Sequence, residues 1–149
     1  MKAEGGCLCG SIRYEVEGEP LITATCYCRD CQYAAGGGPG YAASFLREKV
    51  RITRGEPVTF ESESSAKNRV QRQFCGRCGT PLFSNSSAAP MLLTVKVGSL
   101  DDPSEFRSMG SIWLKSAQPY HRPDKEQRCW DTVPTQQEMN EFLAKRLAR

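Results

Sequence analysis

The stretch Cys75-Gly76-Arg77-Cys78-Gly79 holds two cysteines separated by two residues, and a second pair, Cys7-Leu8-Cys9-Gly10, lies near the N-terminus. A two-residue gap lets the chain turn so that both sulfurs face one ion, and glycine permits the tight backbone approach. Alternate residues of a strand share a face, so the closer pair can also converge on one ion where the chain bends. We therefore expect Cys7, Cys9, Cys75 and Cys78 to form one closed zinc site with a structural role, because four protein ligands leave no position for a substrate.

A third cluster, Cys26-Tyr27-Cys28-Arg29-Asp30-Cys31, offers three further thiolates. Three protein ligands with an open fourth position are typical of a catalytic zinc. An all-thiolate shell makes the ion a weak Lewis acid, which favours binding an exogenous thiolate over generating hydroxide. The sequence predicts a catalytic zinc held by Cys26, Cys28 and Cys31.

Two residues compete for the fourth position at the three-cysteine site. Cys129 would close the site, but it stands alone beside Trp130, and a lone cysteine is usually a small buried hydrophobic residue. His121 has no neighbouring ligand at metal spacing, and it lies in the polar stretch Tyr120-His121-Arg122-Pro123, which predicts an exposed loop. An open site is therefore our expectation, with both alternatives kept.

Composition places the chain among ordinary globular proteins. It has 149 residues, 39% hydrophobic and 25% charged, which suits one domain with a real core. No apolar run approaches the ~20 residues that span a bilayer, and the first residues lack the apolar stretch of a signal peptide. These features predict a cytoplasmic protein without a membrane partner. The eight cysteines also allow a disulfide framework, but disulfides are rare in a reducing cytosol.

Charge gives no support for a nucleic-acid partner. The formal net charge is +3, but seven thiolates subtract seven charges and two zinc ions return four, which leaves the loaded protein neutral. Lysine and arginine are scattered rather than clustered. The single histidine and the absence of a nucleophile-elbow pattern also leave a Ser/His hydrolase unsupported.

Hydrophobic alternation predicts a mainly β fold. The glycine-rich segment 36–40 predicts a flexible loop. Thr135 and Glu138 form a capping box that predicts a C-terminal helix over about 135–148, with an apolar stripe facing the core at Met139, Phe142, Leu143 and Leu147. The fold class is mainly β, a single zinc-stapled antiparallel domain over 1–149 with short helices and a C-terminal helix. The expected strands lie at about 12–16, 21–25, 41–46, 58–61, 70–74, 91–97 and 112–114.

The cysteine motifs, in this order, resemble the glutathione-dependent formaldehyde-activating enzyme family, which also includes centromere protein V. The resemblance covers about residues 4–120. It implies a β-rich fold with two zinc ions, a structural one on Cys7, Cys9, Cys75 and Cys78 and a catalytic one on Cys26, Cys28 and Cys31. It also implies a carbon–sulfur lyase that joins the thiol of glutathione to formaldehyde, giving S-hydroxymethylglutathione. It implies no catalytic residue beyond the zinc ligands. The further matching segments are Gly5-Gly6, Gln32, Phe74, Gly79-Thr80-Pro81-Leu82-Phe83, Val97-Gly98-Ser99-Leu100-Asp101-Asp102 and Ile112-Trp113-Leu114-Lys115-Ser116.

Three positions depart from the family pattern. Members often have histidine where this chain has Tyr27, histidine where it has Ser111, and tryptophan where it has Tyr120. The departures spare the zinc ligands and concern the substrate, which could be another small aldehyde or another thiol. Two non-enzymatic functions remain as alternatives, a zinc-stapled binding module and a zinc or thiol-stress sensor whose three-cysteine site releases metal on oxidation.

Overall fold

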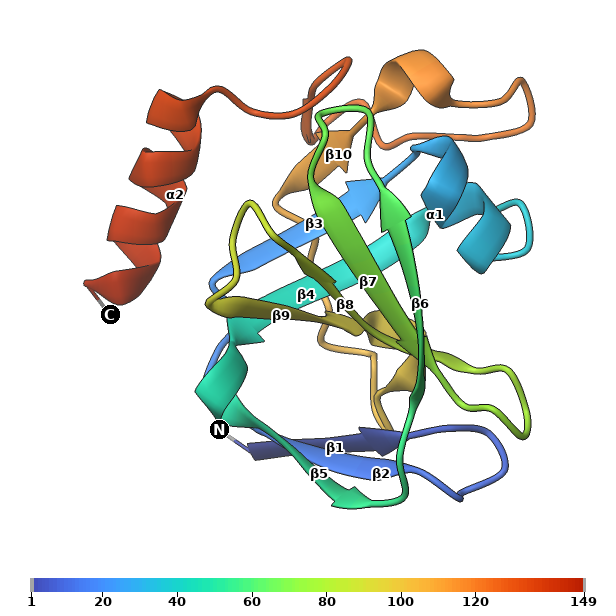
Figure 1. Cartoon of the computed structure of the whole chain (residues 1–149). Coiled ribbons are helices and arrows are strands. Elements are labelled where there is room, and N and C mark those ends of the chain that lie inside the picture. Colours follow the sequence, from blue (N-terminus) through green and yellow to red (C-terminus); the bar gives the residue numbers. More distant parts are fainter. Residues whose placement is uncertain (1, 149) are drawn as a thin grey trace. The chain divides into compact units, whose positions relative to one another are not determined.

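The computed structural model describes residues 2–148, which divide into two compact units. Unit 1 comprises residues 2–20 and Ser44–Phe106, and unit 2 comprises Leu21–Ala43 and 107–148. Across these residues the chain forms eleven strands and few helices, which confirms the predicted mainly β fold class (Figure 1).

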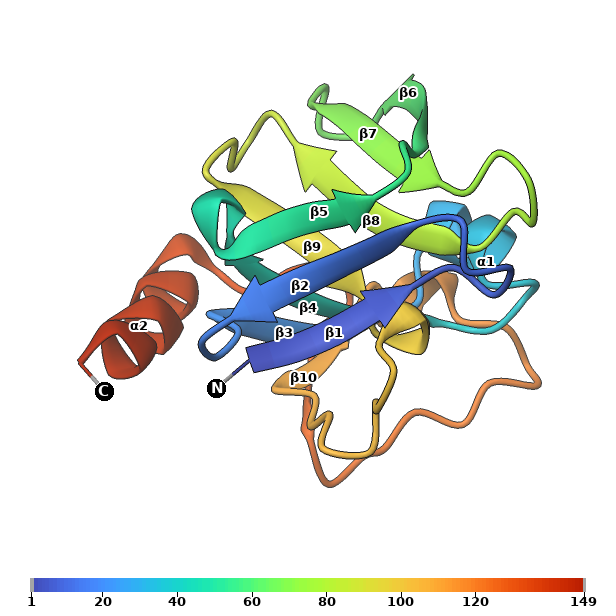
Figure 2. The same cartoon turned by 90° about the horizontal axis from the view of Figure 1, so that it is seen from below.

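Unit 1 consists almost wholly of antiparallel strands. Three of them lie side by side in the order β1-β2-β5 (Figure 2), and four more follow the order β9-β8-β7-β6. Every neighbouring pair in these two groups is antiparallel. The strands are β1 (Lys2–Gly6), β2 (Arg13–Glu17), β5 (Val50–Arg54), β6 (Val58–Glu63), β7 (Arg69–Phe74), β8 (Pro81–Ser86) and β9 (Leu92–Lys96), with short 3-10 turns at Arg47–Lys49 and Val97–Ser99.

The core of unit 1 follows from the alternation along β2. Tyr14 on this strand is buried, and its ring meets the buried ring of Phe83 edge-on with centroids 4.9 Å apart. Fully burying side chains of this size contributes about 1.5–3 kcal/mol each. Gly5 lies against the same tyrosine, where an ideal Cβ would fall 2.4 Å from the phenol oxygen. Only glycine therefore lets β1 approach the ring so closely.

Unit 2 carries the remaining strands and both α-helices. Its strand order is β11-β10-β3-β4, and β10 pairs in parallel with both β3 and β11, so the sheet is not purely antiparallel. The helix α1 starts within three residues of the end of β3 (Figure 1). The elements are β3 (Ile22–Cys26), α1 (Arg29–Ala34), β4 (Gly40–Leu46, whose last three residues belong to unit 1), β10 (Gly110–Ile112), a 3-10 turn at Leu114–Ser116, β11 (Arg128–Cys129) and α2 (Gln136–Leu147).

The C-terminal helix α2 begins as its sequence predicts. The Thr135 side chain accepts from the Glu138 amide, and the Glu138 carboxylate accepts from the Thr135 amide, which completes the capping box. Phe142 packs edge-on against Trp130 with ring centroids 6.0 Å apart. The predicted core stripe is wrong at its end, because Leu147 is 67% exposed and the other stripe residues are only half-buried.

The strands expected from alternation overlap observed strands, but the one expected at 112–114 is wrong beyond Ile112, because Trp113 has a left-handed backbone and a 3-10 turn follows at Leu114–Ser116. Other elements carry no such pattern. β1 has the sequence Lys-Ala-Glu-Gly-Gly, and β5 is mostly exposed on both faces, so neither shows a clear alternation. α1 extends over only six residues and was not expected. No helix within residues 2–148 is long and apolar enough to cross a bilayer.

Candidate metal centres

Unit 1 brings Cys7, Cys9, Cys75 and Cys78 together, with all four sulfurs within 4.8 Å of one another. The Cys9 sulfur lies 3.5 Å from that of Cys7 and 3.8 Å from that of Cys75. A tetrahedral zinc with Zn–S bonds of about 2.3 Å separates its sulfurs by about 3.8 Å. The spacing of the four sulfurs therefore fits a zinc ion.

Backbone amides of unit 1 point at these sulfurs. Cys75 Sγ accepts hydrogen bonds from the amides of Arg77 and Cys78, each at 3.4 Å, and Cys7 Sγ accepts one from Ile12 at 3.2 Å. Hydrogen bonds to a ligand's free lone pairs orient it and stabilise its anionic form. The backbone of both turns is thus arranged for thiolates.

Two hydroxyl groups complete the surroundings of the four-cysteine group. Ser11 Oγ lies 3.0 Å from Cys9 Sγ and 3.4 Å from Cys75 Sγ, and Thr80 Oγ1 lies 3.1 Å from Cys78 Sγ. The same threonine oxygen accepts the Leu8 amide, which ties the two cysteine turns to each other. Sequence reasoning did not identify Ser11 or Thr80. Their only signal is a hydroxyl two residues after Cys9 and two after Cys78.

The thiols of this group ionise unequally. Hydrogen bonds from the Thr80 hydroxyl and amide lower the pKa of Cys78 to about 5. Burial raises the pKa of Cys7, but hydrogen bonds from Ser11 and the Ile12 amide outweigh it and lower that pKa to about 7. Hydrogen bonds from Ser11 lower the pKa of Cys9, yet partial loss of solvent and the adjacent sulfurs of Cys7 and Cys78 leave it above its ordinary value. A divalent cation would remove this repulsion and let all four ionise.

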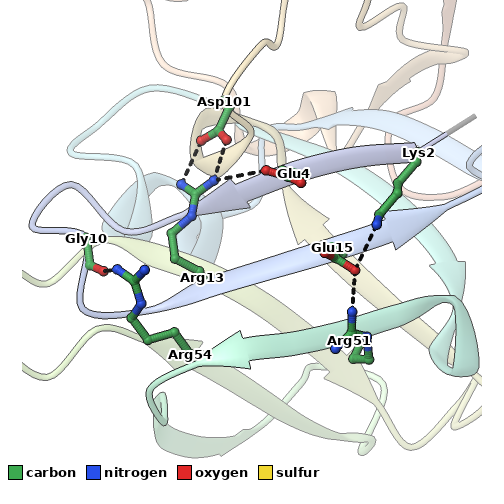
Figure 3. Close-up of polar contacts among 8 residues, drawn as sticks. All are labelled: Lys2, Glu4, Gly10, Arg13, Glu15, Arg51, Arg54 and Asp101. Atoms are coloured by element: carbon green, nitrogen blue, oxygen red, sulfur yellow. Dashed lines mark hydrogen bonds and ion pairs between the residues drawn. The ribbon is translucent and has the colours of Figure 1, made fainter.

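Charged side chains form hydrogen bonds around the β1–β2 hairpin, whose connecting turn carries Cys7 and Cys9. Arg13 on β2 forms two hydrogen bonds to the Asp101 carboxylate, and Arg54 on β5 donates a 3.1 Å hydrogen bond to Gly10 O (Figure 3). The Arg13 guanidinium holds the pKa of Asp101 below its ordinary value. Exposed ion pairs contribute only about 0–1 kcal/mol each to the free energy of unfolding. We therefore infer that these contacts mainly orient the hairpin.

Unit 2 brings together the second cysteine group, Cys26, Cys28 and Cys31, whose sulfurs also lie within 4.8 Å of one another. Cys26 ends β3 and is buried, and Cys28 is the N-cap of α1, where its sulfur accepts the Cys31 amide at 3.3 Å. The short helix thus turns the chain so that the third sulfur meets the first two. Gly40 leaves room for it, since an ideal Cβ there would lie 3.1 Å from Cys31 Sγ.

Without a metal ion, the Cys26 thiol of the three-cysteine group resists ionisation. The sulfurs of Cys28 and Cys31, and then burial, raise the pKa of Cys26 far above its ordinary value. A bound metal ion deprotonates a coordinating thiol outright, because its charge reverses this balance. Within residues 2–148, no fourth histidine, cysteine or carboxylate atom joins the group. The arrangement can hold a metal ion with one coordination position left for another molecule.

The two candidate fourth ligands lie elsewhere in unit 2. Cys129 Sγ contacts the carbonyl oxygens of Gln127 and Asp124 at 3.4 and 3.6 Å, and this residue is exposed rather than buried. None of the eight cysteines forms a disulfide.

Tyr120 and Arg122 are exposed, as expected of a loop, but the expectation is wrong for His121, which is only 8% exposed. Its Nδ1 accepts the Gln118 amide at 2.8 Å, so Nε2 carries the proton and donates to Gly37 O, also at 2.8 Å. Because both ring nitrogens form hydrogen bonds within the protein, His121 stabilises the position of the glycine-rich loop. The Tyr120 hydroxyl donates to the same carbonyl oxygen.

The fold and the two cysteine groups define a mainly β protein with two candidate metal centres, one closed and one open. A sequence profile of the glutathione-dependent formaldehyde-activating enzyme family matches residues 2–116, so the chain belongs to this family. The crystal structure of a Rhodobacter sphaeroides protein has a similar fold. It is 24% identical with a TM-score of 0.53, and the match covers 66% of this chain and 87% of that one. No curated protein matches this chain.

Proposed function

We propose that both cysteine groups bind zinc, with a structural ion on Cys7, Cys9, Cys75 and Cys78 and a catalytic ion on Cys26, Cys28 and Cys31. Donor sets made only of thiolates favour zinc over magnesium, calcium or manganese. The sulfur spacing in unit 1 supports a tetrahedral ion. Eight cysteines without a disulfide also support a reducing, cytoplasmic location.

At the three-cysteine site the proposed reaction is the addition of the glutathione thiol to formaldehyde. Cys26, Cys28 and Cys31 would hold the zinc ion, which would supply a cation to stabilise the glutathione thiolate. A sulfur–carbon bond forms, the carbon–oxygen double bond opens, and the thiol proton ends on the new hydroxyl group of S-hydroxymethylglutathione. The reverse reaction breaks the same bond, which makes the activity that of a carbon–sulfur lyase. Holding the two reactants together supplies most of the gain in rate.

The protein's own residues contribute a fixed site. The Tyr27 amide donates to Ile112 O at 3.0 Å, which anchors the chain between two of the ligands to β10. The single observation that carries the proposal is that three cysteine sulfurs converge without a fourth ligand in the described part of the chain. We further propose that residues 1–149 unfold as one zinc-stapled domain, which a single transition shared by all spectroscopic probes would support.

Two-dimensional proton NMR exchange spectroscopy tests the activity. It measures the rate at which glutathione and S-hydroxymethylglutathione interconvert at equilibrium. We expect the exchange rate to rise in proportion to zinc-loaded protein. Cys28→Ser should abolish this increase, and Cys129→Ser should retain it, since Cys129 lies outside both groups. An exchange rate independent of the wild-type protein would contradict the enzymatic proposal and favour a binding or sensing function.

A further inference from the structure

Gln32 is a buried polar residue that the proposed reaction does not use. It directly follows the ligand Cys31 in α1, and only 1% of its surface is exposed. A buried amide with unmet hydrogen-bonding groups is costly, so its partners indicate what it is built to hold.

All four hydrogen-bonding positions of the Gln32 amide are filled. Nε2 donates to Tyr27 O at 2.8 Å and to Ser116 O at 2.9 Å. Oε1 accepts from Arg29 Nη1 and, at 3.2 Å, from Gln118 Nε2. Carbonyl oxygens can only accept and a guanidinium can only donate, so these partners fix the orientation of the amide.

These contacts join the two arms of the three-cysteine group. Tyr27 O lies between Cys26 and Cys28, while the Gln32 backbone continues directly from Cys31. One side chain therefore links the arm with two ligands to the helix that carries the third. Its bond to Ser116 attaches both arms to the 3-10 turn Leu114–Ser116.

A second set of contacts holds Gln32 itself in place. The Gly37 amide donates to Gln32 O at 2.7 Å, and His121 holds the Gly37 carbonyl. His121 in turn accepts the amide of Gln118, whose side chain reaches back to Gln32. The contacts form a closed ring through residues 32, 37, 121 and 118, so the amide is fixed from both ends.

We propose that Gln32 is the positioning residue of the open metal site, which sets the separation of the three sulfurs before metal or thiol binds. This inference rests on the proposed metal-binding function of Cys26, Cys28 and Cys31. Partners of this kind, which hold metal ligands in place, typically change metal affinity 10–100-fold when they are mutated.

Gln32→Glu tests the role at constant size, because it keeps the acceptor oxygen Oε1 and replaces the Nε2 amino group, so the two hydrogen bonds that Nε2 donates to Tyr27 O and Ser116 O are lost. The protein would be loaded with cadmium-113, which gives one NMR resonance for each occupied site. We expect the resonance of the three-cysteine site to shift or broaden while that of the four-cysteine site stays. Chelator competition should show about 10–100-fold weaker binding of one equivalent of metal only. Gln73→Glu, a half-buried glutamine in unit 1 that bonds Thr59 Oγ1, is the matched control and should change neither.

Unchanged cadmium resonances and unchanged chelator competition in Gln32→Glu would overturn the proposal, even if the melting temperature fell. If this variant fails to fold, Gln118→Met removes one bond to Oε1, and a change confined to the three-cysteine resonance is again expected. No change there would equally overturn the positioning role. A wild-type protein that shows only the four-cysteine resonance would instead contradict the proposed function itself.

Discussion

Replacing one ligand of the four-cysteine site should destabilise the protein by a predictable amount. Cys78→Ser is suited to this because the residue is half-buried and serine is close to it in size, so little packing is lost. Its sulfur belongs to the group that joins the turn at Cys7–Cys9 to the turn at Cys75–Cys78. The loss of stability in Cys78→Ser should therefore measure how much the metal-mediated link between the two turns stabilises the protein.

The size of the effect follows from the chain enclosed by this link. Cys9 and Cys75 are 66 residues apart. Cross-linking a loop of this length removes about 4 kcal/mol of chain entropy from the unfolded state. Domains of this size are stable by about 5–15 kcal/mol, so the loss is a large share of the total. A change of 1 kcal/mol moves the melting temperature by about 2–4 °C, which predicts a fall of about 10 °C.

Calorimetry of the zinc-loaded proteins, with the zinc content of each measured, would check this value. Cys129→Ser is the control, because Cys129 lies outside both cysteine groups and should keep the wild-type melting temperature and zinc content. A Cys78→Ser protein that melts within about 2 °C of wild type would refute the structural role of the four-cysteine site.

Three further predictions concern other residues. Gly40→Ala places a methyl group 3.1 Å from Cys31 Sγ, so chelator competition should show about 10-fold weaker metal binding at the three-cysteine site alone, and equal binding to wild type would contradict this. Lys67 has a φ of 66°, a left-handed conformation that is strained for a residue with a Cβ. Lys67→Gly should raise the free energy of unfolding, measured in urea, by about 0.5–1 kcal/mol, because relief of this strain exceeds the small contribution of the exposed ion pair with Glu63. A decrease in the free energy of unfolding would contradict this prediction. Hydrogen bonds from the Thr135 amide and the Trp130 indole hold the pKa of Glu138 below 4.5, so the stability that this carboxylate gives α2 is present above that pH and lost as the pH falls below it. The Trp130 indole proton resonance should titrate with a midpoint below 4.5, and a midpoint at or above that value would be inconsistent with the capping contacts.

The cysteine spacings contain much of what could be predicted about the candidate sites. Pairs with one or two intervening residues can meet around one ion by local geometry alone, and the structure has the seven cysteines in the same two groups. Likewise, the alternation through Tyr14 and Val16 predicted β2, because a strand with one buried face must repeat every second residue.

Other features depend on contacts between distant segments and leave little local signal. Gln32 directly follows the ligand Cys31 and matches the family pattern, but its burial depends on partners at residues 116 and 118, which the local sequence does not predict. His121 lies in a polar stretch, yet it is buried and its Nε2 donates a hydrogen bond to the carbonyl oxygen of Gly37. Ser11 contributes through its position in a turn that the strand pattern does not describe.

Native mass spectrometry of the purified protein, with and without glutathione, tests the central claim most directly. The account predicts two zinc ions in each chain and one glutathione bound in the wild-type protein. Cys28→Ser should lose the glutathione and keep the zinc of the four-cysteine site. A single zinc ion, or two zinc ions with no glutathione bound, would contradict an open thiol-binding centre at Cys26, Cys28 and Cys31.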